Sequence, residues 1–153
     1  MKKISVLAAI VVVVLFGTAV LAAETCELCG MKLAKYWKTV HKLTFVDGSQ
    51  KSVCSIACAS RMMRKKGDGR VTGIAVVDYR TDKLVKARTA TYVEGSDLKP
   101  VMSMVSRVAF HSAADARQFS KKHGGVMMGF QKALERQREE DAMGHGRKKH
   151  MMH

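Results

Sequence analysis

Two pairs of cysteines constrain this chain more than any other feature. Cys26 and Cys29 are separated by two residues, and Cys54 and Cys58 by three. Spacings this short let two thiolates from one turn bind the same ion, as in structural zinc knuckles and in sites for soft metals. Met31 lies two residues after the first pair and adds a thioether, which Cu(I) accepts as a ligand. We therefore predict a sulfur-rich metal site that contains all four cysteines and Met31.

The N-terminal segment predicts export. Lys2 and Lys3 precede an apolar run at residues 4–16, and small residues follow near Ala22. This is the pattern of a secretory signal peptide, which we expect to cover residues 1–22 and to be cleaved. The run is shorter than the ~20 residues that a membrane-spanning helix needs, and a retained N-terminal anchor is the alternative. We therefore expect a periplasmic or otherwise exported protein.

The net charge of the chain limits the kinds of partner that it can bind. The net charge is +14, and a strongly basic surface suits contact with membrane surfaces or acidic proteins. Export argues against nucleic acid as a partner. A generally solvated basic surface accounts for most of these charges without any partner.

Export also opens an alternative for the cysteines. In an oxidising compartment, four cysteines commonly form two disulfides. Pairing within either cluster would close a very small loop, which gains least from a crosslink, whereas pairing between the clusters is also open. The spacing favours metal and the compartment favours disulfides, so a disulfide-stabilised binding protein is a competing hypothesis.

The residues around the cysteines predict a knuckle, a hairpin and a helix. Residues 24–35 indicate an irregular knuckle, and strands are expected at residues 36–46 and 50–53 around an Asp-Gly turn. A helix with a serine cap then runs to Lys66. Cys54 and Cys58 lie one turn apart at its start, where the helix dipole favours thiolate. This order of elements is the layout of a treble-clef metal site.

The remainder of the chain repeats the same order of elements. Further strands are expected at 71–79, 84–85, 90–93, 107–110 and 126–130, with a helix over 112–123. The fold class predicted is therefore α+β, with two β-β-α-β units that suggest a duplication. The expected organisation is a first unit at 23–82 with the cysteines, a second unit at 83–135, and a disordered basic tail at 136–153.

Several methionines and histidines outside the knuckle are further candidate ligands. Met102 and Met104 alternate as on one face of a strand, where core packing is the simpler explanation and thioether ligation the functional one. The tail is rich in Met and His, and such tracts can collect copper without a folded site, although a solvated tail is the simpler explanation. The tail candidates are His145, His150, Met151, Met152 and His153.

Seven short motifs follow one another along the chain. They are Cys26-Glu-Leu-Cys-Gly-Met31, Val53-Cys-Ser55, Ala90-Thr-Tyr-Val93, Met102, Arg107-Val-Ala-Phe110, Asp115-Ala116 and His123-Gly-Gly125. In this order they resemble the NosL family, accessory copper proteins for maturation of nitrous oxide reductase, over residues 25–135. The cysteine spacing is also similar to that of the TRASH and YHS metal-binding knuckles.

The resemblance implies an exported Cu(I) metallochaperone with two β-β-α-β halves, a topology shared with organomercurial lyase. Cys29, Met31 and Met102 match the family's metal-binding motifs. Cys58, Met104 and the Met/His tail are additional to the family pattern, and the lipoprotein cysteine typical of the family is not evident. The implied partners are proteins that donate or accept copper, with a membrane assembly among the candidates.

No catalytic constellation accompanies these motifs, so we expect no enzymatic activity. Asp47 lies in a turn and Asp115 at a helix cap, which gives paired-carboxylate chemistry no support. A C-x2-C oxidoreductase would need the βαβ context of thioredoxin, which the flanking sequence lacks. The main alternative to Cu(I) is structural Zn(II) held by four thiolates in a protein-interaction module.

Overall fold

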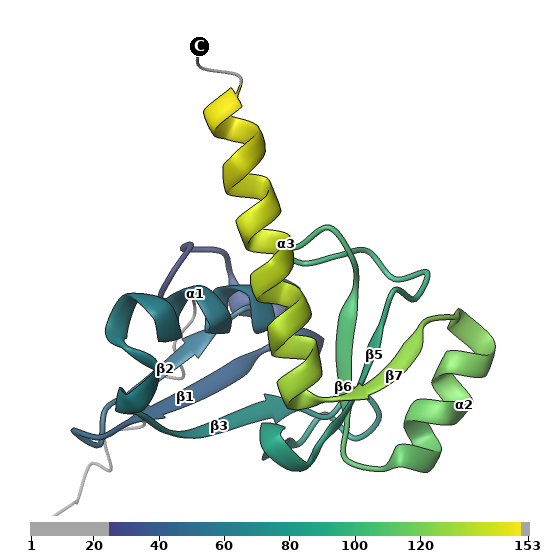
Figure 1. Cartoon of the computed structure of the whole chain (residues 1–153). Coiled ribbons are helices and arrows are strands. Elements are labelled where there is room, and N and C mark those ends of the chain that lie inside the picture. Colours follow the sequence, from purple (N-terminus) through teal and green to yellow (C-terminus); the bar gives the residue numbers. More distant parts are fainter. Residues whose placement is uncertain (1–24, 151–153) are drawn as a thin grey trace, which may run out of the picture.

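Two antiparallel sheets form the framework of the protein (Figure 1). A computed structural model of the chain describes residues 25–150, with side chains described for residues 25–144. The expected signal peptide at residues 1–22 lies outside the described residues. Within the described part, no helix is long and apolar enough to cross a membrane.

The first sheet has the spatial order β2-β1-β3-β4. Its strands are β1 (His41–Phe45), β2 (Gln50–Val53), β3 (Val71–Val77) and β4 (Leu84–Lys86). Helix α1 (Ile56–Lys66) connects β2 to β3 and lies across one face of this sheet (Figure 1). The expected unit boundary after residue 82 is therefore too early, because β4 follows it and still pairs with β3.

The second sheet has the order β6-β5-β7. It consists of β5 (Thr91–Glu94), β6 (Arg107–Phe110) and β7 (Val126–Gly129), with α2 (Ala113–His123) between β6 and β7. Both halves thus contain a β-β-α-β run, to which the first half adds β4, and this confirms the predicted α+β class and the repeated order of elements. Helix α3 (Phe130–His150) follows β7, rises between the two sheets and extends beyond the body of the protein (Figure 1).

Local signals read from the sequence explain where these elements begin and end. Ser55 is the N-cap of α1, and Gly67 ends that helix with a φ of 91°. The Ser112 hydroxyl caps α2 by accepting the Asp115 N–H at 3.3 Å, an N-cap contact that satisfies one of the free donors of the first turn. Gly125 is required by close packing, because a Cβ there would lie 2.7 Å from the Glu94 carbonyl oxygen.

One hydrophobic core joins the two halves. Leu43 and Val53 of the first sheet share a cluster with Tyr92, Phe130 and Leu134 of the second half and α3. A smaller cluster lies under α2, and its members are Val93, Val108, Phe110, Ala116 and Phe119. Since the larger cluster draws on both β-β-α-β units, neither sheet is packed independently of the other.

Polar contacts also cross between the halves. The His41 ring lies within 2.9 Å of the Tyr92 hydroxyl through Nε2, and both side chains are buried. Asp78, at the end of β3, accepts the His111 N–H at 3.3 Å, and Tyr79 N–H donates to the Ala109 carbonyl at 2.8 Å. These contacts fix the sheets at a defined relative position.

The segment before β1 differs from the strand expected at residue 36. It forms two short 3-10 helices, Leu33–Lys35 and Trp37–Thr39, and β1 begins only at His41. The Thr39 hydroxyl donates to the Cys54 carbonyl at 2.7 Å. This segment therefore turns over the second cysteine pair instead of extending the hairpin.

The predicted disorder from residue 136 is wrong for the described part of the tail, because α3 continues to His150. Gln137 and Asp141 are buried on its inner face. The Asp141 carboxylate binds Arg61 at 2.7 Å and Arg64 at 2.9 Å, both from α1. After Leu134 the inner face of the helix is held by these ion pairs, so this part of its sequence shows no apolar stripe.

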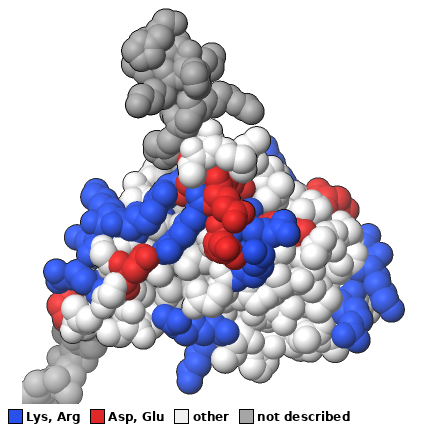
Figure 2. All heavy atoms as spheres, in the orientation of Figure 1, with Lys and Arg blue, Asp and Glu red and all other residues white. Residues whose placement is uncertain are grey.

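Charge is unevenly distributed on the face seen in Figure 2. Basic side chains lie at the left and right edges and at the lower centre of this view, and a group of acidic side chains lies near its middle (Figure 2). Further basic side chains lie directly beside this acidic group, so charges of both signs are mixed there.

Candidate metal centre

The four cysteines predicted to act together lie in one cluster. Their Sγ atoms are all within 4.8 Å of one another. Cys54 Sγ lies 3.6 Å from Cys58 Sγ and 3.7 Å from Cys29 Sγ. Four sulfur atoms this close match a ligand set for one tetrahedral or lower-coordinate soft ion.

The first pair is held by a tight knuckle. Cys26 N–H donates to the Met31 carbonyl at 2.8 Å, and Gly30 N–H donates to the Cys26 carbonyl at 2.8 Å. Gly30 has a φ of 75°, a conformation that glycine adopts without a steric cost. The turn therefore aims both thiols of the C-x2-C motif inward, and the Glu27 N–H bond to the Ser52 carbonyl joins the knuckle to β2.

The second pair comes from the junction of β2 and α1. Cys54 directly precedes the N-cap Ser55, and Cys58 lies in the first turn of the helix. The chain enters the helix at Ser55, and the Sγ atoms of Cys54 and Cys58 lie 3.6 Å apart across this junction. The Glu27–Ser52 backbone hydrogen bond holds the knuckle with the first pair against β2, next to them.

Solvent reaches the cluster mainly at one of its four thiols. Cys26, Cys54 and Cys58 are buried, whereas Cys29 is only half-buried. Cys29 is thus the one thiol of the four that an incoming ion or a partner's ligand reaches from solvent.

The thiols differ in acidity because they bind one another. Hydrogen bonds from Cys58, and then from Cys29 and Cys26, lower the pKa of Cys54 to about 6 against the opposing effect of burial. Donating its proton to Cys54, together with burial, raises the pKa of Cys58. Burial is also the main cause that raises the pKa of Cys29. Among these three thiols, Cys54 therefore loses its proton most readily in the metal-free protein.

The low pKa of Cys54 predicts that one thiolate forms at a lower pH than an ordinary thiol. In reduced, metal-free protein, the ultraviolet absorbance of thiolate should rise with a midpoint near pH 6, well below the ordinary thiol pKa of 9.0. Cys54→Ser should remove that step, because the serine hydroxyl does not ionise in this range. The same step in Cys54→Ser would show that another group carries the charge.

Comparison with known proteins identifies the family. The family model for NosL matches residues 18–136. The chain belongs to the NosL family. Among solved structures, the copper chaperone NosL from Shewanella denitrificans is 22% identical, with a TM-score of 0.62, over 71% of this chain and 88% of that chain. At this identity the likeness shows the fold, and a search of curated proteins gave no match.

The two methionines that match the NosL motifs line a cavity next to the thiol cluster. Met31 and Met102 both contribute to a cavity of about 440 Å³, here called cavity A. Ser55, the neighbour of Cys54, also lines it. The Met31 backbone forms a hydrogen bond with Cys29, which partly offsets the larger effect by which burial raises the pKa of that thiol. The predicted thioether ligands of the family pattern therefore share cavity A and lie outside the group of four sulfurs.

Met104 does not line cavity A, but it lines a second cavity together with Met102. A second cavity of about 500 Å³, here called cavity B, is lined by Met102 and Met104 together with residues of α1 and α3. Met104 is 69% exposed and Met102 is 39% exposed, so neither is a core residue. Packing, the simpler explanation for Met104, does not fit this exposure.

The tail candidates cannot be placed against the cluster. The backbone of His145 and His150 lies in α3, but their side chains fall outside the described residues, as do Met151, Met152 and His153 entirely. The predicted role of the tail in metal binding stays a prediction.

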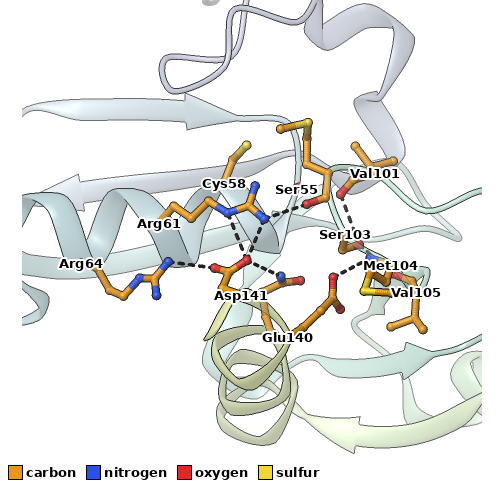
Figure 3. A network of polar contacts seen from close by, with 12 residues as sticks. Ser55, Cys58, Arg61, Arg64, Val101, Ser103, Met104, Val105, Glu140 and Asp141 are labelled. Atoms are coloured by element: carbon orange, nitrogen blue, oxygen red, sulfur yellow. Dashed lines mark hydrogen bonds and ion pairs between the residues drawn. The ribbon is translucent and has the colours of Figure 1, made fainter. Parts of the chain in front are cut away.

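Sequence reasoning missed the polar network around cavity B. Arg61 lies one turn after Cys58 and binds both Asp141 of α3 and the Met102 carbonyl, the latter at 3.1 Å. Glu140 accepts the Met104 N–H (Figure 3). The one signal in the sequence is the i, i+3 spacing of Cys58 and Arg61, which puts them on the same side of α1.

Proposed function

We propose that this chain is an exported copper-binding protein of the NosL family, a metallochaperone that holds Cu(I) and passes it to an extracytoplasmic cuproenzyme such as nitrous oxide reductase. The observation that carries the proposal is the cluster of four Sγ atoms within 4.8 Å. Cu(I) prefers thiolate and thioether ligands, and the cluster with Met31 and Met102 beside it offers both.

The acidity of the thiols suits capture of a cation. The Cys54 thiolate supplies a negative charge near neutral pH, and the metal displaces protons from further thiols as it binds. Cys29 stands at the solvent side of the cluster, where an incoming ion reaches it first. Copper remains Cu(I) throughout, because ligand exchange between sulfur atoms moves no electron.

The proposal is tested by competition for Cu(I). Reduced protein is titrated against a chromogenic Cu(I) chelator, and the wild type is compared with Cys29→Ser and Met102→Leu. We expect each variant to lose about 10- to 100-fold in affinity, the scale typical of groups that support a metal site. Met127→Leu removes a thioether that packs in the separate cluster under α2, and it should bind like the wild type. Unchanged affinity in both test variants would reject the site.

A structural zinc site is the second candidate, and burial of three of the four thiols favours it. A closed set of four thiolates suits a tetrahedral Zn(II) that joins the knuckle to α1 in a treble-clef arrangement. Metal analysis of freshly purified protein separates the two proposals. One tightly bound zinc that Cu(I) does not displace supports the structural module, whereas displacement supports the copper carrier.

A disulfide-stabilised binding protein is tested by a thiol count. Four reactive thiols in protein isolated under native oxidising conditions would exclude it. Two or fewer would favour it over either metal.

A further inference from the structure

We infer that cavity B is an exit site for the soft ion, in which Met104 accepts Cu(I) from Met102 before a partner removes it. The inference rests on the proposed function and concerns the direction of release. Its basis is the arrangement of three methionines along two cavities that share one residue, Met102.

The two cavities connect the buried cluster to the surface. Cavity A adjoins the thiols through Met31 and Ser55, the chain neighbours of the cysteine pairs, and Met102 lines the same cavity. Met102 also lines cavity B, together with Met104. The exposed fraction rises from 39% at Met102 to 69% at Met104. The three thioethers therefore run from the half-buried knuckle to Met104, the more exposed of the two loop methionines.

The loop that carries Met102 and Met104 is held in place by two helices. Arg61 Nη2 of α1 donates to the Met102 carbonyl at 3.1 Å, and the Glu140 carboxylate of α3 accepts the Met104 N–H. Figure 3 shows Arg61 reaching toward Asp141 and Glu140 reaching toward the loop at Met104. Met102 has a φ of 56°, a conformation that a non-glycine residue keeps only when its surroundings impose it. The loop is thus built into a fixed position.

The charges around cavity B suit a monovalent cation. Its lining contains the carboxylates of Glu140 and Asp141 and the single guanidinium of Arg61. Asp141 is additionally paired with Arg64, and Glu140 with Arg107. Within the lining itself, two carboxylates therefore face one guanidinium, and the two further arginines that pair with them do not line the cavity.

Transfer along this route needs only ligand exchange. At each step one copper–sulfur bond forms to the next thioether while one to the previous sulfur breaks, and the ion remains Cu(I). A thiolate that loses the ion takes a proton from water. Because a neutral thioether binds more weakly than the thiolates behind it, the ion leaves only when an acceptor competes for it.

The experiment measures the rate of release separately from affinity. The Cu(I)-loaded full chain is mixed with excess bathocuproine disulfonate in a stopped-flow instrument, and equilibrium affinity is measured with the same chelator. Met104→Leu should slow the release of Cu(I) by about tenfold. Its equilibrium affinity for Cu(I) should stay within about twofold of that of the wild type. The matched control Met127→Leu should change neither quantity.

Three results decide the matter. Slower release with unchanged affinity supports the exit site. Release at the wild-type rate from Met104→Leu overturns it, because the ion then leaves directly at Cys29. A loss of affinity in Met104→Leu also overturns it, because Met104 then belongs to the resting site. A wild type that retains no Cu(I) would instead contradict the proposed function itself.

Discussion

Replacing Arg107 by methionine should lower the free energy of unfolding by about 3–5 kcal/mol, as expected when one partner of a buried ion pair is removed. The Arg107 side chain is only 3% exposed. It donates to Glu94 at 2.6 Å, to Gln137 at 2.6 Å and to Glu140 at 3.1 Å. Methionine fills much of the same space but leaves two carboxylates without this cation, so the penalty is the cost of their uncompensated charge. Urea unfolding followed by circular dichroism measures the loss.

Arg138→Met is the matched control for this variant. Arg138 pairs with Asp68 at 2.9 Å, but these side chains are 34% and 51% exposed. Solvent screens such a pair, so the control should lose less than about 1 kcal/mol. Glu94 keeps a second partner in Arg136 at 3.1 Å, which places the expected loss for Arg107→Met toward the lower end of its range. Equal losses in the two variants would mean that α3 is not held by the buried network.

The parts of the fold that could be predicted are those set by local signals. Ser112 and Gly124 bound α2 as expected, and Gly48 occupies the predicted turn between β1 and β2 with a φ of 77°. The cysteine cluster was predictable for the same reason, because a C-x2-C knuckle and a pair one helical turn apart fix the direction of their thiols locally. The repeated β-β-α-β order followed from these boundaries.

The parts that could not be predicted depend on partners distant in the chain. Gln137 and Asp141 look like surface residues in a polar segment, yet Arg107 and Arg61 bind them across the fold. A hydrophobic pattern counts only apolar residues, so it carries no sign of a helix buried through ion pairs. The position of Met104 beside Glu140 likewise depends on α3. The sequence predicts a disordered tail from residue 136, so it gives no sign of this contact.

Acid should destabilise the protein through His41 well before the carboxylates are protonated. Burial lowers the pKa of His41 from its usual 6.5 to about 4. Between these values the unfolded chain binds a proton that the folded protein does not. Stability contributed by the neutral ring is therefore complete above pH 6.5 and is lost as the pH falls toward 4. The difference corresponds to a total of about 3 kcal/mol.

Burial keeps the His41 ring neutral in the folded state, and the hydrogen bonds of the ring set which nitrogen carries the proton. Nδ1 lies 2.9 Å from the Thr39 carbonyl oxygen, which only accepts, so Nδ1 carries the proton. Nε2 then accepts the Tyr92 hydroxyl proton at 2.9 Å. A second proton would place a buried positive charge between the two sheets, away from water. It would also require the Tyr92 hydroxyl to accept a hydrogen bond from Nε2 instead of donating one.

The measurement compares urea unfolding of the reduced, metal-free protein between about pH 5.5 and 4.5, where one pH unit should cost the wild type about 1 kcal/mol. Cys54, with a pKa of about 6, is largely protonated throughout this interval. Asp78 has a pKa below its usual 3.8, so its stabilisation is lost only at still lower pH. His41→Gln should begin less stable but show little slope here, because glutamine does not titrate. Equal slopes in both proteins would show that another group senses the acid.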